Sequence, residues 1–290
     1  MSSAPRTLAD VVAALDDLYP PSTAEGWDAV GLVAGDPHRE VRQVMFAVDP
    51  VDAVVDEAIE WGADLLVTHH PLFLKPVTSV AATTFKGSVV HRLLAAGCAL
   101  HVAHTNADSA PRGVADALAD LVGITDRRPL VARVDDVERG IGRVGPLERP
   151  TTLGELARRV ADVLPATAQG VRVAGDLDAE VTTAAVVGGS GDSLFDAVRA
   201  AAVDVYVTAD LRHHPASELR ERAAFEAGHD APPESGRPFL IDVAHFASEW
   251  PWLAYAAADL TDRLGDGTVT TRVSTLVTDP WTTRVASTGR

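Results

Sequence analysis

Histidines and carboxylates gather at three separated places in this chain of 290 residues, and each place directly follows an apolar run. The pairs are His69 and His70 in DLLVTHHPLF, His104 and Asp108 in HVAHTNAD, and His245 and Glu249 in IDVAHFASEW. Imidazole nitrogens together with carboxylate oxygens suit first-row transition metals. The residue types therefore predict a metal site for Zn, Fe or Mn.

Each group taken alone also has a plainer interpretation. His245 and Glu249 are four residues apart, so a helix would place them on one face, but such pairs also occur on solvated helices. His69 and His70 stand where an apolar strand is expected to end, and a histidine pair packed in a loop would look the same. The HTNAD segment is equally compatible with turn chemistry, because Asn and Asp side chains bond to nearby backbone.

The three groups together say more than any one of them. In open α/β sheets the binding crevice lies beyond the carboxyl ends of the strands, where side chains distant in sequence meet. One zinc takes three or four protein ligands, whereas the chain offers a larger set, namely His69, His70, Asp108, His245 and Glu249. Carboxylates can bridge two ions, so the set predicts a dinuclear centre with an activated water.

Alternating strands and helices would position these residues. In the N-terminal part we expect strands at 41–48, 65–68 and 99–103, with helices at 51–61 and 86–96 between them. Residues 126–150 are charged and glycine-rich, which indicates a junction, and a second α/β set follows. The final elements are a strand at 239–243 and a helix from about 248 to 264. This alternation predicts an α/β fold with mostly parallel sheets.

Composition excludes several classes of protein. The net charge of −16 argues against nucleic acid as a partner and against docking to an anionic membrane, since both need a basic surface. The single cysteine, Cys98, excludes an internal disulfide and is interpreted as a buried strand residue. The N-terminal MSSAPRTLADVV lacks a signal-peptide pattern, and no apolar run is long enough for a membrane helix. A cytoplasmic protein is expected.

Several motifs in order resemble the GTP cyclohydrolase 1 type 2 homologue family, also called the Nif-three-like family. WDAVGLVAG resembles its WDNVGL segment, THHPLFLKP its His-His motif and HTNAD its HTNxD motif. GGSGDSLFDAV, VTADLRHHPA and DVAHFASE resemble its GGSG, TGDxxxH and GHxxSE motifs. The resemblance covers nearly the whole chain. Ala29, Ala209 and Ala244 depart from the residues usual in these motifs, namely Asn, Gly and Gly.

The resemblance implies a ligand set, a fold and an assembly. The family's dinuclear ligands fall on His69, His70, Asp108, His245 and Glu249. The implied fold is two α/β domains, the second inserted into the first. Because all the ligands must meet, we expect residues 1–128 and 238–290 to form the metal-binding domain and residues 129–237 the inserted one. The resemblance also implies a ring-shaped homohexamer.

Other residues near these motifs have less certain roles. His104 and His214 are candidate catalytic residues, as a general acid or a substrate contact, although His104 can equally be a packed histidine or orient Asp108. His213 is interpreted as a surface residue. GGSGD is rich enough in glycine to cradle an anion through its backbone N–H groups. Ser190 has no evident histidine partner in sequence, so a serine nucleophile is not expected.

Two functions follow. The first is a metal-dependent hydrolase acting on a small molecule such as a nucleotide or phosphoester, and the family name implies opening of the purine ring of GTP. The second is a non-enzymatic, metal-binding oligomeric scaffold or a metal-handling protein. The second is favoured by the lack of an obvious cationic clamp beside the ligands, Arg212 being the nearest candidate. Turnover assays with reconstituted metal would distinguish the two.

Overall fold

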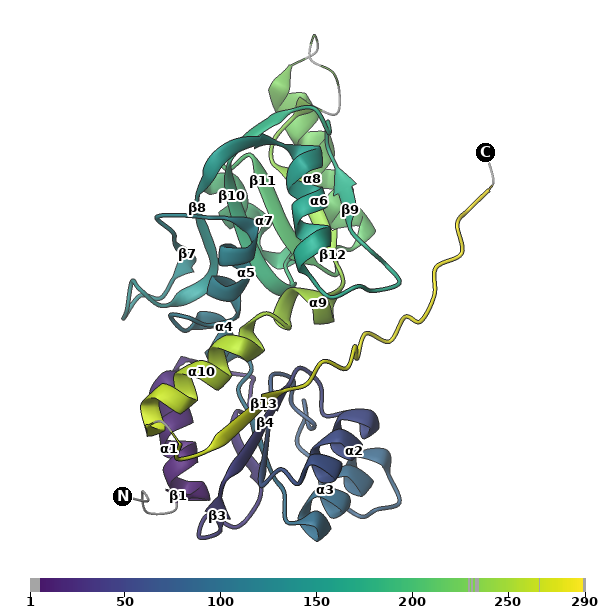
Figure 1. Cartoon of the computed structure of the whole chain (residues 1–290). Helices are drawn as coiled ribbons and strands as arrows, with labels where there is room; N and C mark the ends of the chain where they lie inside the picture. The colour runs from purple at the N-terminus through teal and green to yellow at the C-terminus, as the bar shows by residue number, and fades with distance from the viewer. Residues whose placement is uncertain (1–5, 229, 231, 233–234, 266, 289–290) are drawn as a thin grey trace. The chain divides into compact units, whose positions relative to one another are not determined.

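The computed structural model describes residues 6–228, 230, 232, 235–265 and 267–288 (Figure 1). Residues 1–5, part of the N-terminal segment used in the argument about targeting, lie outside the described residues. Contacts divide the chain into two compact units. Unit 1 comprises Met1–Gly113 and Leu253–Thr278, and unit 2 comprises Val114–Trp252 and Asp279–Arg290.

Unit 1 is built on a mostly parallel sheet. Its described strands have the order β13-β4-β5-β6-β2, and only β2 runs antiparallel to its neighbour. The strands are β2 (Gly31–Ala34), β4 (Gln43–Ala47), β5 (Leu65–Thr68), β6 (Ala99–Val102) and β13 (Thr270–Val273). The strands predicted at 41–48, 65–68 and 99–103 are thus confirmed as β4, β5 and β6, which run parallel and end at the same edge of the sheet.

Helices cover both faces of this sheet (Figure 1). They are α1 (Leu8–Leu18), α2 (Asp52–Trp61), α3 (Phe85–Ala96) and α10 (Trp252–Leu264). On one face α2 and α3 bury Val55 and Leu93 against Met45 and Leu66 of the sheet. Small elements complete the unit, namely β1 (Arg6–Thr7) paired with β3 (Glu40–Val41), the 3-10 turn η1 (Pro21–Thr23) and α4 (Thr105–Ser109).

Cys98 confirms its interpretation as a buried residue. It is 1% exposed and belongs to the core cluster under α2 and α3. Burial raises the pKa of its thiol to about 12, because a thiolate would be poorly solvated there. The thiol therefore stays protonated and acts as a small apolar side chain.

Unit 2 is built on a mixed sheet. The strands described in it have the order β7-β8-β10-β11-β12-β9, in which only β10, β11 and β12 are mutually parallel. They are β7 (Arg128–Ala132), β8 (Gly140–Thr152), β9 (Arg172–Ala174), β10 (Glu180–Ser190), β11 (Val205–Ala209) and β12 (Phe239–Val243). The stretch interpreted as a junction instead supplies β7 and β8, in which Leu130, Val144 and Leu147 are buried.

The helices of unit 2 lie against this sheet (Figure 1). They are α5 (Val114–Val122), α6 (Leu153–Val163), α7 (Phe195–Ala200), α8 (His213–Ala227) and α9 (His245–Glu249), with the 3-10 turn η2 (Asp192–Leu194) before α7. The helix predicted at 248–264 is two helices, α9 and α10. Pro251 lies between them, and its lack of an N–H interrupts a continuous helix.

Contact clustering divides the chain at other residues than the predicted domains do. Residues 114–128, 238–252 and 279–288 are predicted for the metal-binding domain but fall in unit 2, where α5 packs on β8 and β10, and β12 pairs with β11. The predicted domain boundaries stay a prediction. Insertion of one domain into the other stays a prediction. Among the helices that the structure describes, none is long and apolar enough to cross a membrane.

Candidate metal centre

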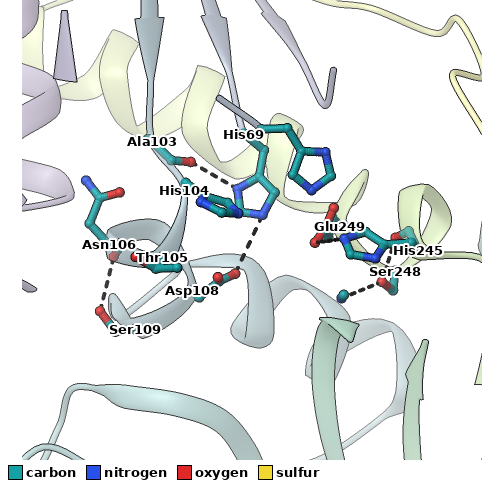
Figure 2. A network of polar contacts seen from close by, with 12 residues as sticks. His69, Ala103, His104, Thr105, Asn106, Asp108, Ser109, His245, Ser248 and Glu249 are labelled. Carbon is teal, nitrogen blue, oxygen red and sulfur yellow. Dashed lines mark hydrogen bonds and ion pairs between the residues drawn. The ribbon is translucent and has the colours of Figure 1, made fainter. Parts of the chain in front are cut away.

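His69 lies directly after β5, fully buried, and its ring is oriented by the neighbouring strand. Because β5 and β6 are parallel and end together, the carbonyl of Ala103 lies 3.0 Å from His69 Nδ1 (Figure 2). A carbonyl can only accept, so Nδ1 carries a proton and Nε2 is the nitrogen left for a metal ion. That Nε2 lies 3.7 Å from Asp108 Oδ1, which pairs it with a second predicted ligand.

His70 is oriented in the same way by a different strand end. Its Nδ1 lies 2.7 Å from Oδ1 of Asp49, a residue that follows β4. Asp49 is itself held, since its Oδ2 accepts a hydrogen bond from the hydroxyl of Thr278. A carboxylate behind an imidazole fixes the ring and makes the opposite nitrogen a better ligand. His70 Nε2 is therefore the nitrogen prepared for a metal ion.

His104 follows the same arrangement at the end of β6. Its Nδ1 lies 3.0 Å from Oδ2 of Asp28, and this buried carboxylate also accepts from the backbone and the hydroxyl of Thr105. Burial, with a smaller effect of the neighbouring His69 and His70, lowers the pKa of His104 to about 4, although Asp28 opposes the change. The ring is neutral at pH 7, with a lone pair on Nε2.

Unit 1 therefore brings together His69, His70, His104 and Asp108. One ligand nitrogen from each of the three histidines lies within 4.8 Å of the other two, an arrangement that can hold a metal ion. Their ring centroids are 5.1–5.6 Å apart. The donor set, imidazoles beside a carboxylate, fits a divalent transition metal.

Unit 2 brings together the other predicted ligands. His245 and Glu249 are the first and last residues of α9, and His245 Nε2 lies 3.0 Å from Glu249 Oε1 (Figure 2). His245 Nδ1 lies 2.7 Å from Oδ2 of Asp210, which follows β11 in a left-handed conformation with φ of 53°. Glu249 is almost fully buried, at 3% exposure. The separation of four residues therefore places the His245 and Glu249 side chains in contact on one face of α9, as the sequence predicts.

The GGSGD turn at the end of β10 fits closely beside this pair. Gly189 has φ of 69°, and a Cβ there would lie 2.6 Å from Glu249 Oε1 and 3.1 Å from His245 Nε2. Only glycine leaves room for both side chains at this position. The amide of Gly189 donates to Ser248 Oγ at 2.8 Å and that of Gly191 to the Ala209 carbonyl at 3.4 Å. The turn therefore uses these amides within the fold rather than offering them to an anion.

His213 and His214 are the first two residues of α8, and both are exposed. Their rings pack edge to face with centroids 5.2 Å apart. Exposure agrees with the interpretation of His213 as a surface residue. A catalytic role for His214 stays a prediction.

The carboxylates behind the histidines, Asp28, Asp49 and Asp210, were not singled out from the sequence. The signal was present, because Asp49 and Asp210 each follow a predicted strand, and Asp28 lies in the WDAVG motif. Two of the departures from the family pattern, Ala209 and Ala244, do not disturb the backbone. Ala244 has φ of −69° and ψ of 141°, and Ala209 is an ordinary strand residue paired with Val243, so alanine fits both positions.

Known proteins resemble this chain over nearly all of its length. A family profile described as Duf34/NIF3 (NGG1p interacting factor 3) matches residues 6–280. A Streptomyces coelicolor protein named GTP cyclohydrolase 1 type 2 homolog is 56% identical, covering 97% of this chain and 95% of its own. A Mycobacterium tuberculosis protein of the same name is 37% identical, covering 94% and 96%.

Solved structures agree with this result. A Bacillus cereus protein related to NIF3 superposes with a TM-score of 0.83 at 22% identity, covering 96% of this chain and 99% of its own. A Staphylococcus aureus hypothetical protein superposes with a TM-score of 0.82 at 27% identity and the same coverage. The first likeness concerns the fold alone, whereas the sequence matches extend through every motif of the site. The chain belongs to the Duf34/NIF3 (NGG1p interacting factor 3) family.

Proposed function

We propose that this protein is a metal-dependent hydrolase whose dinuclear centre is formed by His69, His70, Asp108, His245 and Glu249. The substrate class is a nucleotide or another phosphoester. The curated relatives are named GTP cyclohydrolase 1 type 2 homologs, so opening of the purine ring of GTP is the first reaction to test. Two bound divalent ions would supply a water whose pKa is lowered toward about 7 and a positive charge for the reacting centre.

One observation carries the proposal. In each proposed ligand histidine, Nδ1 faces an oxygen acceptor, which is Ala103 O for His69, Asp49 for His70 and Asp210 for His245. Histidines packed only for structure have no reason to share one tautomer, whereas metal ligands are usually backed by an acceptor in this way. The shared Nε2 lone pair therefore supports a role as ligands.

The surrounding residues would bind substrate and move protons. His104, neutral at pH 7, has its Nδ1 proton directed to Asp28 and its Nε2 beside His69 and His70, so Nε2 is suited to accept a hydrogen bond from substrate or water. His214 is exposed and would serve as a general acid once a substrate is bound. A side-chain nucleophile is not needed, and Ser190 is an exposed residue of a glycine turn.

A specific observation favours the alternative of a non-enzymatic metal-binding scaffold. Arg212, the cation expected to clamp a phosphate, already forms a forked pair with Asp192, at 2.5 Å and 3.0 Å. A guanidinium held by a carboxylate is less available to a phosphate substrate. Metal handling without turnover would not require that clamp.

Metal analysis and turnover test the proposal together. We expect up to two Zn, Fe or Mn ions per chain after reconstitution, fewer in His245→Ala and Asp108→Ala, and an unchanged number in His213→Ala. Hydrolysis of GTP or of a phosphoester panel should vanish on chelation, return with metal and largely survive in Ser190→Ala. Turnover by metal-free protein would overturn the mechanism, and failure to retain any ion would overturn the site. Metal binding without turnover would favour the scaffold.

A further inference from the structure

Unit 2 contains a pocket that includes none of the proposed metal ligands. It lies between α8 and the edge strand β9, and its volume is about 370 Å³. This is at the lower end of the range in which small-molecule sites fall, roughly 300–1,000 Å³. The pocket is therefore large enough for a compact organic molecule.

A stripe along α8 forms one wall of the pocket. His213, Ala216, Ser217 and Arg220 line it, and their spacing places them on one face of the helix. The opposite wall and the floor are mainly aliphatic, with Val173 and Ala174 from β9, Leu240 from β12 and Leu211 from the loop before α8. The apolar part of a bound molecule would be shielded from water by these side chains.

The polar rim carries an excess of positive charge. Arg172 donates through Nε to Asp242 at 2.7 Å, and Arg220 donates to the carbonyl of Pro238 at 2.7 Å. The pocket is thus lined by two guanidinium groups and one carboxylate, and that carboxylate is 4% exposed and also accepts a hydrogen bond from Gln169. A locally positive pocket is unusual in a chain whose net charge is −16.

We propose that this pocket binds a small organic anion, with a carboxylate or phosphate head held by Arg172 and Arg220 and an apolar body packed against Val173, Ala216 and Leu240. This site is separate from the proposed metal centre and does not depend on the proposed hydrolase activity.

The state of the two arginines supports an anionic head. The Arg172 side chain is 58% exposed, so its planar group can turn its outer edge to a ligand while Asp242 holds the inner edge. Burial lowers the pKa of Arg220, because its guanidinium is partly desolvated. A bound anion would offset that desolvation, and Ser217 on the same wall can donate a hydrogen bond to the same head.

Titration calorimetry on the full chain tests the proposal with three probes, namely benzoate, phenyl phosphate and the neutral benzyl alcohol. Saturable binding of benzoate or phenyl phosphate in the millimolar range or tighter is expected, with benzyl alcohol at least about tenfold weaker. The two anions distinguish a carboxylate site from a phosphate site. No saturable binding of either anion, or equal binding of benzyl alcohol, would overturn the proposal.

Variants locate the binding. Ser217→Phe, which fills the pocket, and Arg172→Gln, which keeps a donor to Asp242 but removes the charge, should each weaken anion binding at least about tenfold. Arg222→Gln is the matched control, since Arg222 lies on α8 outside the pocket and pairs with Glu226. If Arg172→Gln melts below the native chain, Ser217→Phe decides the question, because it leaves the pair between Arg172 and Asp242 in place.

The metal state provides the last control. Saturable binding should persist in both metal-reconstituted and chelated protein, because the pocket contains no proposed ligand. Loss of binding on chelation, or full affinity in Ser217→Phe, would place the anion elsewhere and refute the pocket as its site.

Discussion

At the scale of single residues, the acceptor behind a histidine decides which nitrogen can meet a metal. His70 and His245 are both backed by a carboxylate at 2.7 Å, from Asp49 and Asp210. A carboxylate accepts but cannot donate, so it excludes the tautomer with a proton on Nε2. We therefore expect these two aspartates to affect metal affinity, although neither belongs to the proposed ligand set.

Replacing either aspartate tests this role. In Asp49→Asn and Asp210→Asn the amide can present an N–H to the ring and loses the charge, so metal affinity should fall by about 10–100-fold. Competition with a chromophoric chelator would measure it. Asp196→Asn, an exposed position in the first turn of α7, is the control and should bind metal like the native chain. Native affinity in both test variants would remove the positioning role.

Sequence reasoning identified side chains that could ligate but not those that orient them. His69, Asp108, His245 and Glu249 were recognisable because histidine beside carboxylate at strand ends is a rare combination. Asp49 was not, because a lone aspartate after a strand is common, and only the structure shows which ring it contacts. Hydrogen-bond partners distant in sequence cannot be read from spacing.

At the scale of elements, the close fit of the β10 turn against α9 depends on a glycine. Gly189 and Gly170 both have positive φ, of 69° and 66°, but only Gly189 would bring a Cβ against neighbouring atoms. Alanine at Gly170 would introduce only the strain of a left-handed backbone, whereas alanine at Gly189 would add a steric clash.

Gly170→Ala should lower the free energy of unfolding by about 1–2 kcal/mol, the penalty for a left-handed alanine. Gly189→Ala should lower it further and should also weaken metal binding, because His245 and Glu249 must move. Urea unfolding and metal titration would measure both effects. Equal losses in the two variants, with metal binding intact, would contradict the close fit.

A buried ion pair joins α5 to β8. Asp116 is 5% exposed and accepts from Arg143 Nη2 at 2.8 Å, and Arg143 is 3% exposed. Asp116 and Asp120 both also contact Arg127, but the Asp120 side chain is 42% exposed. Removing Asp116 would leave the buried guanidinium of Arg143 without its carboxylate partner and without water. Removing the exposed Asp120 would leave no buried charge.

Asp116→Ala should therefore lower the free energy of unfolding by about 3–5 kcal/mol, and Asp120→Ala by no more than about 1 kcal/mol. Chemical denaturation would measure both. The double change Asp116→Leu with Arg143→Met should recover much of the loss, since no charge is then buried alone. Similar small losses in both single variants would contradict the buried pair.

The elements predicted from apolar runs were recovered where burial is continuous. β5 and β12 agree with their patterns, because every residue of both strands is buried. The β7 and β8 strands were missed because exposed charges such as Arg149 interrupt their apolar pattern. The break between α9 and α10 was also missed, although Pro251 was visible.

At the scale of the whole molecule, the family resemblance implies a homohexamer. Light scattering coupled to size exclusion should then give about six times the chain mass of 30.5 kDa at micromolar concentration. The net charge of −16 per chain opposes close assembly, so the hexamer should become more stable as salt screens that repulsion. A monomer at all salt concentrations would contradict this expectation.

The two carboxylate oxygens of Asp242 accept hydrogen bonds from different parts of unit 2. One oxygen accepts from Arg172 at the rim of the α8–β9 pocket, and the other accepts from the amide of Leu211 at 3.0 Å, next to Asp210, which orients His245. An anion that draws Arg172 away would change how firmly Asp242 holds that loop. Thermodynamic reciprocity then requires that metal at His245 alter anion affinity by the same factor as the anion alters metal affinity. If the anion is a cellular metabolite, its concentration would act as an effector of metal occupancy.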